Sequence, residues 1–129
     1  MSKRILVVDD EEVISVYLQK KLEKLGYDVT VANDGEKALN VAVNEKPDIV
    51  LMDVKLPKMT GTDVCRLLKA DNNTRNIPVI LLSAKAQPAE IKAGLDAGAD
   101  RYMCKPASFP AILDAIHTLE GLAQSGNQE

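Results

Sequence analysis

The chain lacks several features that would assign it to common functional classes. No apolar stretch approaches the roughly 20 residues that cross a bilayer as a helix, so we expect no contact with a membrane. Lysine and arginine do not cluster, and the net charge is −3. Direct binding to nucleic acid is therefore not expected, because phosphate binding needs concentrated positive charge. The first residues lack the pattern of a signal peptide, which favours a cytoplasmic protein.

Cysteine is also scarce. Cys65 and Cys104 are the only two, and both fall in apolar patterns. We therefore expect buried free thiols in a reducing compartment rather than a disulfide framework. With 129 residues, of which 46% are hydrophobic, the chain suits one core. We predict a single globular domain over residues 1–122, followed by a polar, disordered tail over residues 123–129.

Short apolar runs alternate with helical patterns along the chain. Three of these runs are continuous, at residues 5–8, 49–52 and 79–82, which is typical of strands buried on both faces of a parallel sheet. The run at residues 29–31 alternates with a polar residue and predicts an edge strand. A weaker fifth run covers residues 102–104.

Helical patterns fill the gaps between these runs and follow the last one. The candidate residues for the helix N-termini are Asp10, Asp34, Thr62, Gln87 with Pro88 after it, and Ser108. Five strands that alternate with five helices predict an α/β fold. Right-handed crossovers would then build a doubly wound, five-stranded parallel sheet with helices on both faces.

Polar side chains that can carry chemistry follow four of the five predicted strands. They are Asp9 and Asp10 after the first strand, Asp53 after the third, Ser83 after the fourth and Lys105 after the fifth. Open α/β sheets bind their ligands at the carboxyl ends of the strands, so we expect these side chains at one edge of the sheet.

Three carboxylates at one edge repel one another, and a hard divalent cation relieves that repulsion. Oxygen ligands in an incomplete cage suit Mg²⁺, which keeps waters that a substrate phosphate can replace. A carboxylate beside the metal can act as a nucleophile and form an aspartyl phosphate. Lys105 and the Ser83 hydroxyl would then bind the phosphoryl oxygens, because positioning and charge neutralisation carry most of the catalysis in phosphoryl transfer.

Five short motifs occur in a characteristic order: residues 7–11, 51–57 with Gly61, 82–85, 98–100 and 105–106. In this order they resemble the receiver domains of two-component response regulators, over about residues 3–122. The resemblance implies a flavodoxin-like fold with strand order 2-1-3-4-5. It also implies a phosphorylation-activated switch, which takes a phosphoryl group from a histidine kinase or phosphotransfer protein and signals by conformational change to an unknown downstream protein.

The resemblance assigns a role to each of the polar residues. Asp53 matches the phosphoacceptor. Asp10 matches the direct acidic ligand of Mg²⁺, Asp9 matches the acid beside it, and the backbone carbonyl of Lys55 matches the third protein ligand. Lys55 and Lys85 border the phosphoryl group in such domains, and we expect them to tune its lifetime.

Three further residues match the catalytic and switch positions of the family. Ser83 matches the residue whose hydroxyl moves toward the phosphoryl group, and Lys105 matches the invariable lysine, whose bond to Pro106 is typically cis. Tyr102 matches the aromatic switch position, whose ring turns inward when Ser83 moves. We expect residues 83–98 to be the mobile output element.

The sequence departs from the commonest family pattern at two places. Residues 107–108 separate the Lys-Pro pair from Phe109, and Arg101 stands where an acid is frequent in a branch that dimerises through its last helices. This dimer mode is therefore in doubt, and we expect a monomer or a weak phosphorylation-dependent dimer.

Two other functions are compatible with the expected fold. An aspartyl-nucleophile phosphatase would place a second Asp two residues after Asp53, where this chain has Lys55, so a proton donor for turnover is missing. A flavin-binding module would need a phosphate-binding loop after the first strand, where residues 9–12 are all acidic. We therefore expect no enzyme beyond catalysis of its own phosphorylation and dephosphorylation, and keep the phosphatase as the alternative.

Overall fold

The computed structural model describes residues 3–85 and 87–128. Strands and helices alternate along this part of the chain. In chain order they are β1 (Arg4–Val8), α1 (Glu12–Lys24), β2 (Asp28–Ala32), α2 (Gly35–Glu45), β3 (Ile49–Asp53), α3 (Gly61–Ala70), β4 (Val79–Ser83), α4 (Pro88–Asp96), β5 (Arg101–Cys104) and α5 (Phe109–Gln128). The strands form one parallel sheet in the order β2-β1-β3-β4-β5, which confirms the predicted fold class and the edge position of the second strand.

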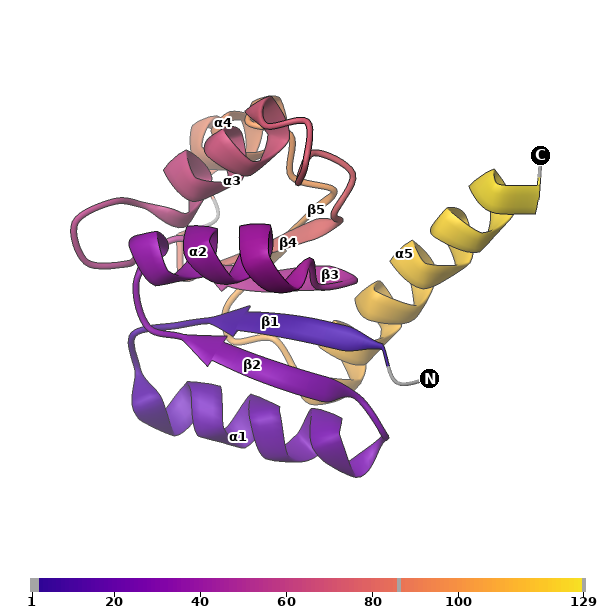
Figure 1. Ribbon diagram of the computed structural model, residues 1–129. Coiled ribbons are helices and arrows are strands. Elements are labelled where there is room, and N and C mark those ends of the chain that lie inside the picture. The colour runs from indigo at the N-terminus through magenta and orange to yellow at the C-terminus, as the bar shows by residue number, and fades with distance from the viewer. Residues whose placement is uncertain (1–2, 86, 129) are drawn as a thin grey trace.

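Helices cover both faces of the sheet, and each face has its own apolar core (Figure 1). On one face, Leu6 and Val8 of β1 pack with residues of α2, α3 and the segment directly after α4. On the other, Ile5 and Val7 pack with residues of α1 and α5. Because successive residues of a strand point to opposite faces, a strand covered on both sides must be apolar at every position. The continuous apolar runs of the sequence have this cause.

Three of the five predicted helix N-termini are confirmed. The Asp34 side chain accepts a hydrogen bond from the Lys37 amide (2.8 Å) at the start of α2. Ser108 accepts one from the Ala111 amide (3.2 Å) just before α5. α4 begins at Pro88, directly after Gln87, because proline has no amide hydrogen to leave unpaired in the first turn.

Two predicted caps were wrong, each by a small shift along the chain. The N-cap of α1 is Glu11 rather than Asp10, and its side chain makes no capping hydrogen bond. α3 is capped by Thr60 rather than Thr62. The Thr60 hydroxyl accepts from the Asp63 amide (3.1 Å), and the Asp63 carboxylate accepts from the Thr60 amide (3.3 Å). This reciprocal pair satisfies two amides at once, which a cap at Thr62 could not do.

Some burial predictions also need correction. Cys65 is buried as expected, but Cys104 is exposed because it ends an edge strand. Leu95, a large apolar residue of α4, is 48% exposed. In the structure, α5 runs to Gln128, whereas the sequence predicts a disordered tail from residue 123. The domain end at residue 122 stays a prediction.

No helix among the described residues is long and apolar enough to cross a membrane.

Gly61 seats the start of α3 directly on the backbone at the end of β3. Its amide donates to the Val54 carbonyl (2.8 Å), and a Cβ at this position would collide with the Asp53 carbonyl oxygen and lie 3.0 Å from the Val54 Cα. Backbone atoms cannot rotate aside as a flexible side chain can. The absence of a side chain at Gly61 therefore fixes how α3 approaches Asp53.

We predict that Gly61→Ala destabilises the fold by about 1–3 kcal/mol, because the added methyl group forces the backbone at Asp53 and Val54 to shift. Gly121→Ala is the matched control, since a Cβ at Gly121 has no atom within 4 Å and alanine favours a helix. Urea denaturation of the two variants checks this. Equal midpoints for both would show that the backbone at the end of β3 adapts freely.

Candidate functional site

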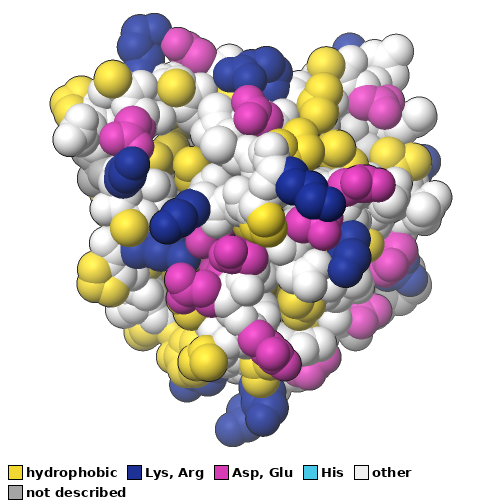
Figure 2. All heavy atoms as spheres, turned by 90° about the vertical axis from the view of Figure 1, so that its left-hand side faces the viewer, with side chains coloured by type: hydrophobic (Ala, Val, Ile, Leu, Met, Phe, Trp, Pro, Cys, Tyr) yellow, Lys and Arg dark blue, Asp and Glu magenta, His cyan; other side chains and the backbone are white. Residues whose placement is uncertain are grey.

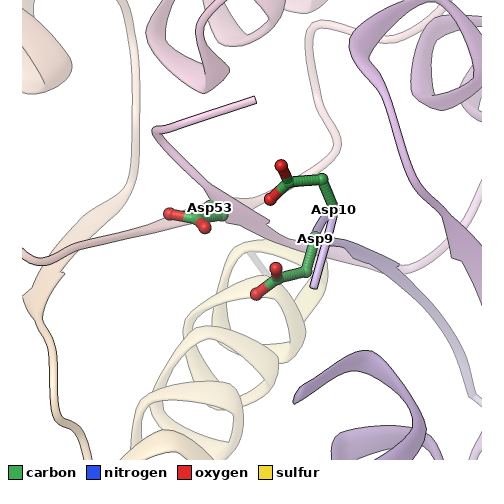
Figure 3. A group of neighbouring side chains, drawn as sticks. All are labelled: Asp9, Asp10 and Asp53. Carbon is green, nitrogen blue, oxygen red and sulfur yellow. The ribbon is translucent and has the colours of Figure 1, made fainter. Parts of the chain in front are cut away.

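Three carboxylates meet at the carboxyl ends of β1 and β3, which are neighbours in the sheet (Figure 3). Asp9 and Asp10 directly follow β1, and Asp53 is the last residue of β3. One carboxylate oxygen from each lies within 4.8 Å of the others. Asp9 and Asp53 are only 3% and 6% exposed, whereas Asp10 is open to solvent. The three groups form a compact oxygen donor set with one open side.

Lys105 approaches this cluster from the end of β5. Its Nζ lies 3.1 Å from Asp53 Oδ2 and 3.4 Å from Asp9 Oδ2, so one ammonium group is shared between the two buried carboxylates. The peptide bond between Lys105 and Pro106 is cis, as the family resemblance implies. A single positive charge balances only one of the carboxylates, and the cluster keeps an excess of negative charge.

The pKa values of these groups report the same imbalance. Burial raises the pKa of Asp9, and the hydrogen bond from the Glu11 amide (2.9 Å) and the charge of Lys105 only partly oppose this. Burial lowers the pKa of Lys105, but the hydrogen bond and charge of Asp53, followed by those of Asp9, raise it by more. The lysine therefore stays protonated, while ionised Asp9 is in an unfavourable environment.

Two short loops fix the polar groups at the ends of β3 and β4. Ser83 is 5% exposed, and its hydroxyl accepts a hydrogen bond from the Lys85 amide (3.0 Å), while Asp53 accepts one from the Lys55 amide (3.3 Å). In both loops the side chain bonds to the backbone two residues ahead, which holds it at the sheet edge. The side chains of Lys55 and Lys85 are exposed.

Figure 2 shows this edge of the molecule from outside. Acidic side chains gather near the centre of the face, and lysine and arginine side chains lie around them. The structure thus brings the strand-end residues of the sequence analysis to one edge. They are Asp9, Asp10, Asp53, Ser83 and Lys105.

Tyr102 lies on β5, the edge strand next to Ser83. Its ring packs with the core on the α2, α3 and α4 side, and its hydroxyl donates to the Lys85 carbonyl (3.1 Å). A Cβ at Gly94 of α4 would press against this ring. This contact has no signal in the sequence, because no motif reports which residue of α4 faces β5.

A doubly wound parallel sheet with a charged cluster at its carboxyl edge defines an α/β domain of the CheY-like, flavodoxin-like type. The chain belongs to the response regulator receiver domain family, whose family model matches residues 5–117. Two-component signalling, phosphorylation and Mg²⁺ binding are general features of that family. The matches give no support to the alternative of an aspartyl-nucleophile phosphatase.

Relatives of known sequence or structure place the chain within this family. It is 49% identical over 108 residues to the alkaline phosphatase synthesis transcriptional regulatory protein PhoP of Bacillus subtilis, covering 84% of this chain and 44% of PhoP. A CheY-like receiver domain protein of Methanospirillum hungatei is 30% identical, with a TM-score of 0.88 and full coverage of both chains. The chain spans about half the length of the curated relatives it matches.

A third similar structure was solved with a metal ion. The receiver domain of a sensor histidine kinase from Pseudomonas aeruginosa is 34% identical and has a TM-score of 0.80, with 90% of this chain and 94% of that domain covered. That structure has a magnesium ion coordinated in its active-site cleft.

Proposed function

We propose that this chain is a phosphorylation-activated switch in which Asp53 accepts the phosphoryl group. The observation that carries the proposal is the position of the Asp53 carboxylate. It ends the central strand, lies within 4.8 Å of two other carboxylates, and is 3.1 Å from the Lys105 ammonium group. A nucleophilic oxygen, an acidic donor set for a cation and a fixed positive charge are thus in one place.

In the proposed reaction, a carboxylate oxygen of Asp53 attacks the phosphorus of a phosphohistidine on a histidine kinase or phosphotransfer protein. The new bond joins this oxygen to phosphorus, and the bond between phosphorus and the histidine nitrogen breaks. Lys105 is already within hydrogen-bonding distance of Asp53 and neutralises charge on the transferred oxygens. The Ser83 hydroxyl lies at the end of the adjacent strand and donates to one of these oxygens.

The donor set fits Mg²⁺, because the ligands are all oxygen and their mutual repulsion favours a divalent cation. The side chains of Asp9, Asp10 and Asp53 and the backbone carbonyl of Lys55 would hold the ion. When bound, Mg²⁺ supplies charge neutralisation for the phosphoryl oxygens. The metal-bound receiver domain of Pseudomonas aeruginosa, which has the same fold, supports this assignment.

We propose that the signal leaves through Ser83, Tyr102 and α4. The Lys85 residue joins them, since its amide donates to Ser83 and its carbonyl accepts from Tyr102. α4 is short, at nine residues, and Gly94 is its one buried residue among those described. An element with so little buried apolar surface has low local stability and can change position at small cost.

The partners of this switch are a histidine kinase or phosphotransfer protein upstream and a protein target downstream. We expect the same machinery to catalyse phosphorylation and dephosphorylation of Asp53 without turnover of external substrates. Lys55 replaces the second acid that a phosphatase of similar fold would use as a proton donor.

Phosphorylation at Asp53 is the first prediction of this proposal. Acetyl phosphate with Mg²⁺ should add one phosphoryl group to the wild-type chain, as measured by intact mass. Asp53→Asn removes the nucleophile but keeps the shape of the side chain, so it should add none. Asp10→Asn should label much more slowly, because it retains Asp53 but loses a metal ligand. Equal labelling of Asp53→Asn and wild type would refute the assignment.

Asp9→Asn should change stability in opposite directions with and without metal. In metal-free buffer at pH 7 the variant should melt at a higher temperature than wild type, because it removes one of three crowded charges while its carbonyl oxygen still accepts from the Glu11 amide. The sign agrees with the raised pKa of Asp9, since a raised carboxyl pKa means that ionisation opposes folding. That penalty is fully present above the raised pKa and fades as the pH falls through it.

With Mg²⁺ the wild type should melt at a higher temperature than Asp9→Asn. A ligand that binds only the native state stabilises it by RT ln(1 + [L]/Kd), about 1.4 kcal/mol at ten times Kd. Wild type should gain this increment and Asp9→Asn much less of it, while Asp10→Ala should not respond. Differential scanning fluorimetry across a Mg²⁺ titration measures all three. A wild-type melting temperature that ignores millimolar Mg²⁺ would contradict the metal site.

Lys55 should prolong the life of the phosphoryl group. Its amide bonds to Asp53, so its long side chain starts beside the phosphorylation site and can block the in-line approach of water. Its charge could instead favour hydrolysis, but the reaction has a loose transition state, and Lys105 and Mg²⁺ already neutralise the oxygens. We predict that Lys55→Ala dephosphorylates several-fold to about tenfold faster, and tenfold corresponds to about 1.4 kcal/mol.

The measurement is loss of phosphate from purified phosphorylated protein at fixed Mg²⁺. Lys85→Ala should act in the same direction but less strongly, because Lys85 follows Ser83 rather than Asp53. Lys24→Ala serves as the control, since Lys24 is exposed at the far end of α1. An unchanged or slower rate for Lys55→Ala would show that occlusion is not its role.

A further inference from the structure

Gly94 lies in α4 directly against the ring of Tyr102. A Cβ on Gly94 would be 2.7 Å from Cδ2 and 2.9 Å from Cε2 of the ring, and 3.2 Å from Cδ1 of Leu81. Real Cβ atoms do not approach other atoms as closely as the two ring distances require, so any side chain at this position must displace the ring or move the helix. Gly94 is buried, and the ring of Tyr102 is what covers it.

The backbone does not require glycine at this position. Gly26 and Gly98 have φ angles of +96° and +104°, which favour glycine, but Gly94 has ordinary helical geometry inside α4. Glycine inside a helix costs about 1 kcal/mol relative to alanine. Helix formation alone would therefore favour alanine, and the structural reason for glycine is the space that the Tyr102 ring occupies.

The ring in this position links α4 to the loop after β4. The Tyr102 hydroxyl donates to the Lys85 carbonyl (3.1 Å), and the Lys85 amide donates to the Ser83 hydroxyl (3.0 Å). A continuous set of contacts therefore runs from the strand end beside Asp53 to the middle of α4. Gly94 is the last member of this set, and its missing side chain leaves space for the Tyr102 ring.

We propose that Gly94 is a positioning residue of the switch, because its missing side chain lets the Tyr102 ring lie inward against α4, where its hydroxyl reaches the Lys85 carbonyl. This inference rests on the proposed switch function of Tyr102. A larger residue at position 94 favours an outward ring and uncouples α4 from the phosphorylation site.

The neighbours of Gly94 decide which group would yield to an added methyl group. Leu81 belongs to a strand covered on both faces and is fully buried, so it has nowhere to go. Tyr102 is on the edge strand and only partly buried, so its ring can rotate outward into solvent. Gly94→Ala should therefore keep α4 folded, move the ring and break the hydrogen bond to Lys85.

Fluorine NMR of protein labelled with 3-fluorotyrosine tests the position of the ring. The chain has three tyrosines, so three signals are expected, and Tyr→Phe variants assign them. The Tyr102 signal should shift in Gly94→Ala and stay in place in Gly121→Ala, which makes the same change in a helix with no atom near the added methyl group. An unmoved Tyr102 signal in Gly94→Ala would overturn the proposal.

Beryllofluoride with Mg²⁺ tests the coupling to the phosphorylation site. Coupling between two sites is reciprocal, so a ring held outward should weaken beryllofluoride binding, by about fivefold or more. Gly94→Ala should show this weakening and Gly121→Ala should not. In a Tyr102→Ala background there is no ring to displace, so adding Gly94→Ala should change neither binding nor folding for the worse. Equal weakening in both backgrounds would refute a role through the ring.

The fluorine NMR and beryllofluoride experiments together distinguish a failure of the proposed role of Gly94 from a failure of the proposed switch function. If wild type takes up no beryllofluoride, the proposed switch function fails, while the fluorine signals still decide whether Gly94 holds the ring inward. If wild type and Gly94→Ala bind beryllofluoride alike, the switch function stands and the role of Gly94 is refuted. If Gly94→Ala unfolds alone but folds together with Tyr102→Ala, the contact with the ring is established.

Discussion

One lysine shared between two buried carboxylates is the interaction on which the site depends. Lys105 lies 3.1 Å from Asp53 and 3.4 Å from Asp9, and a third carboxylate, that of Asp10, lies close by. Without this positive charge, two ionised acids at 3% and 6% exposure would repel each other in a poorly solvated place. With it, the cluster is tolerated but still carries too much negative charge. The remaining imbalance favours a cation.

The parallel sheet brings the members of this cluster together. Parallel strands end at the same edge of the sheet, so residues far apart in sequence become neighbours, and Lys105 reaches Asp9 across a separation of 96 residues. The central strands β1, β3 and β4 are buried by helices on both faces of the sheet, which keeps the ends of β1 and β3 in place and excludes water from the core beneath the site. Gly61 adds a close backbone contact beside Asp53. The carboxylates are thus held by a core that cannot relax to separate them.

The sequence predicts the parts of this structure that depend on burial and local hydrogen bonding. Continuous apolar runs mark the central strands, and Asp34 caps its helix as expected. Strand order came from a family resemblance, because periodicity does not say which strands are neighbours. The errors have two causes. Thr60 rather than Thr62 caps α3 because of a local reciprocal bond with Asp63, three residues further on. Cys104 is exposed only because β5 is an edge strand, which tertiary contacts decide. The Gly94–Tyr102 contact has no local signal for the same reason.

The hydrogen-bonding capacity of Ser83 offers a route by which phosphorylation at Asp53, as proposed above, changes the contacts of α4. A hydroxyl has one donor and two acceptor sites, and in this structure Ser83 accepts from the Lys85 amide. Its donor can therefore turn to a phosphoryl oxygen without losing the bond from Lys85, so a movement of Ser83 carries the Lys85 backbone with it. The carbonyl of the same residue holds the Tyr102 hydroxyl, whose ring rests on Gly94. Lys85 thus bonds to Ser83 through its amide and to Tyr102 through its carbonyl. Neither bond depends on the Lys85 side chain, so a substitution of that exposed lysine leaves both bonds in place.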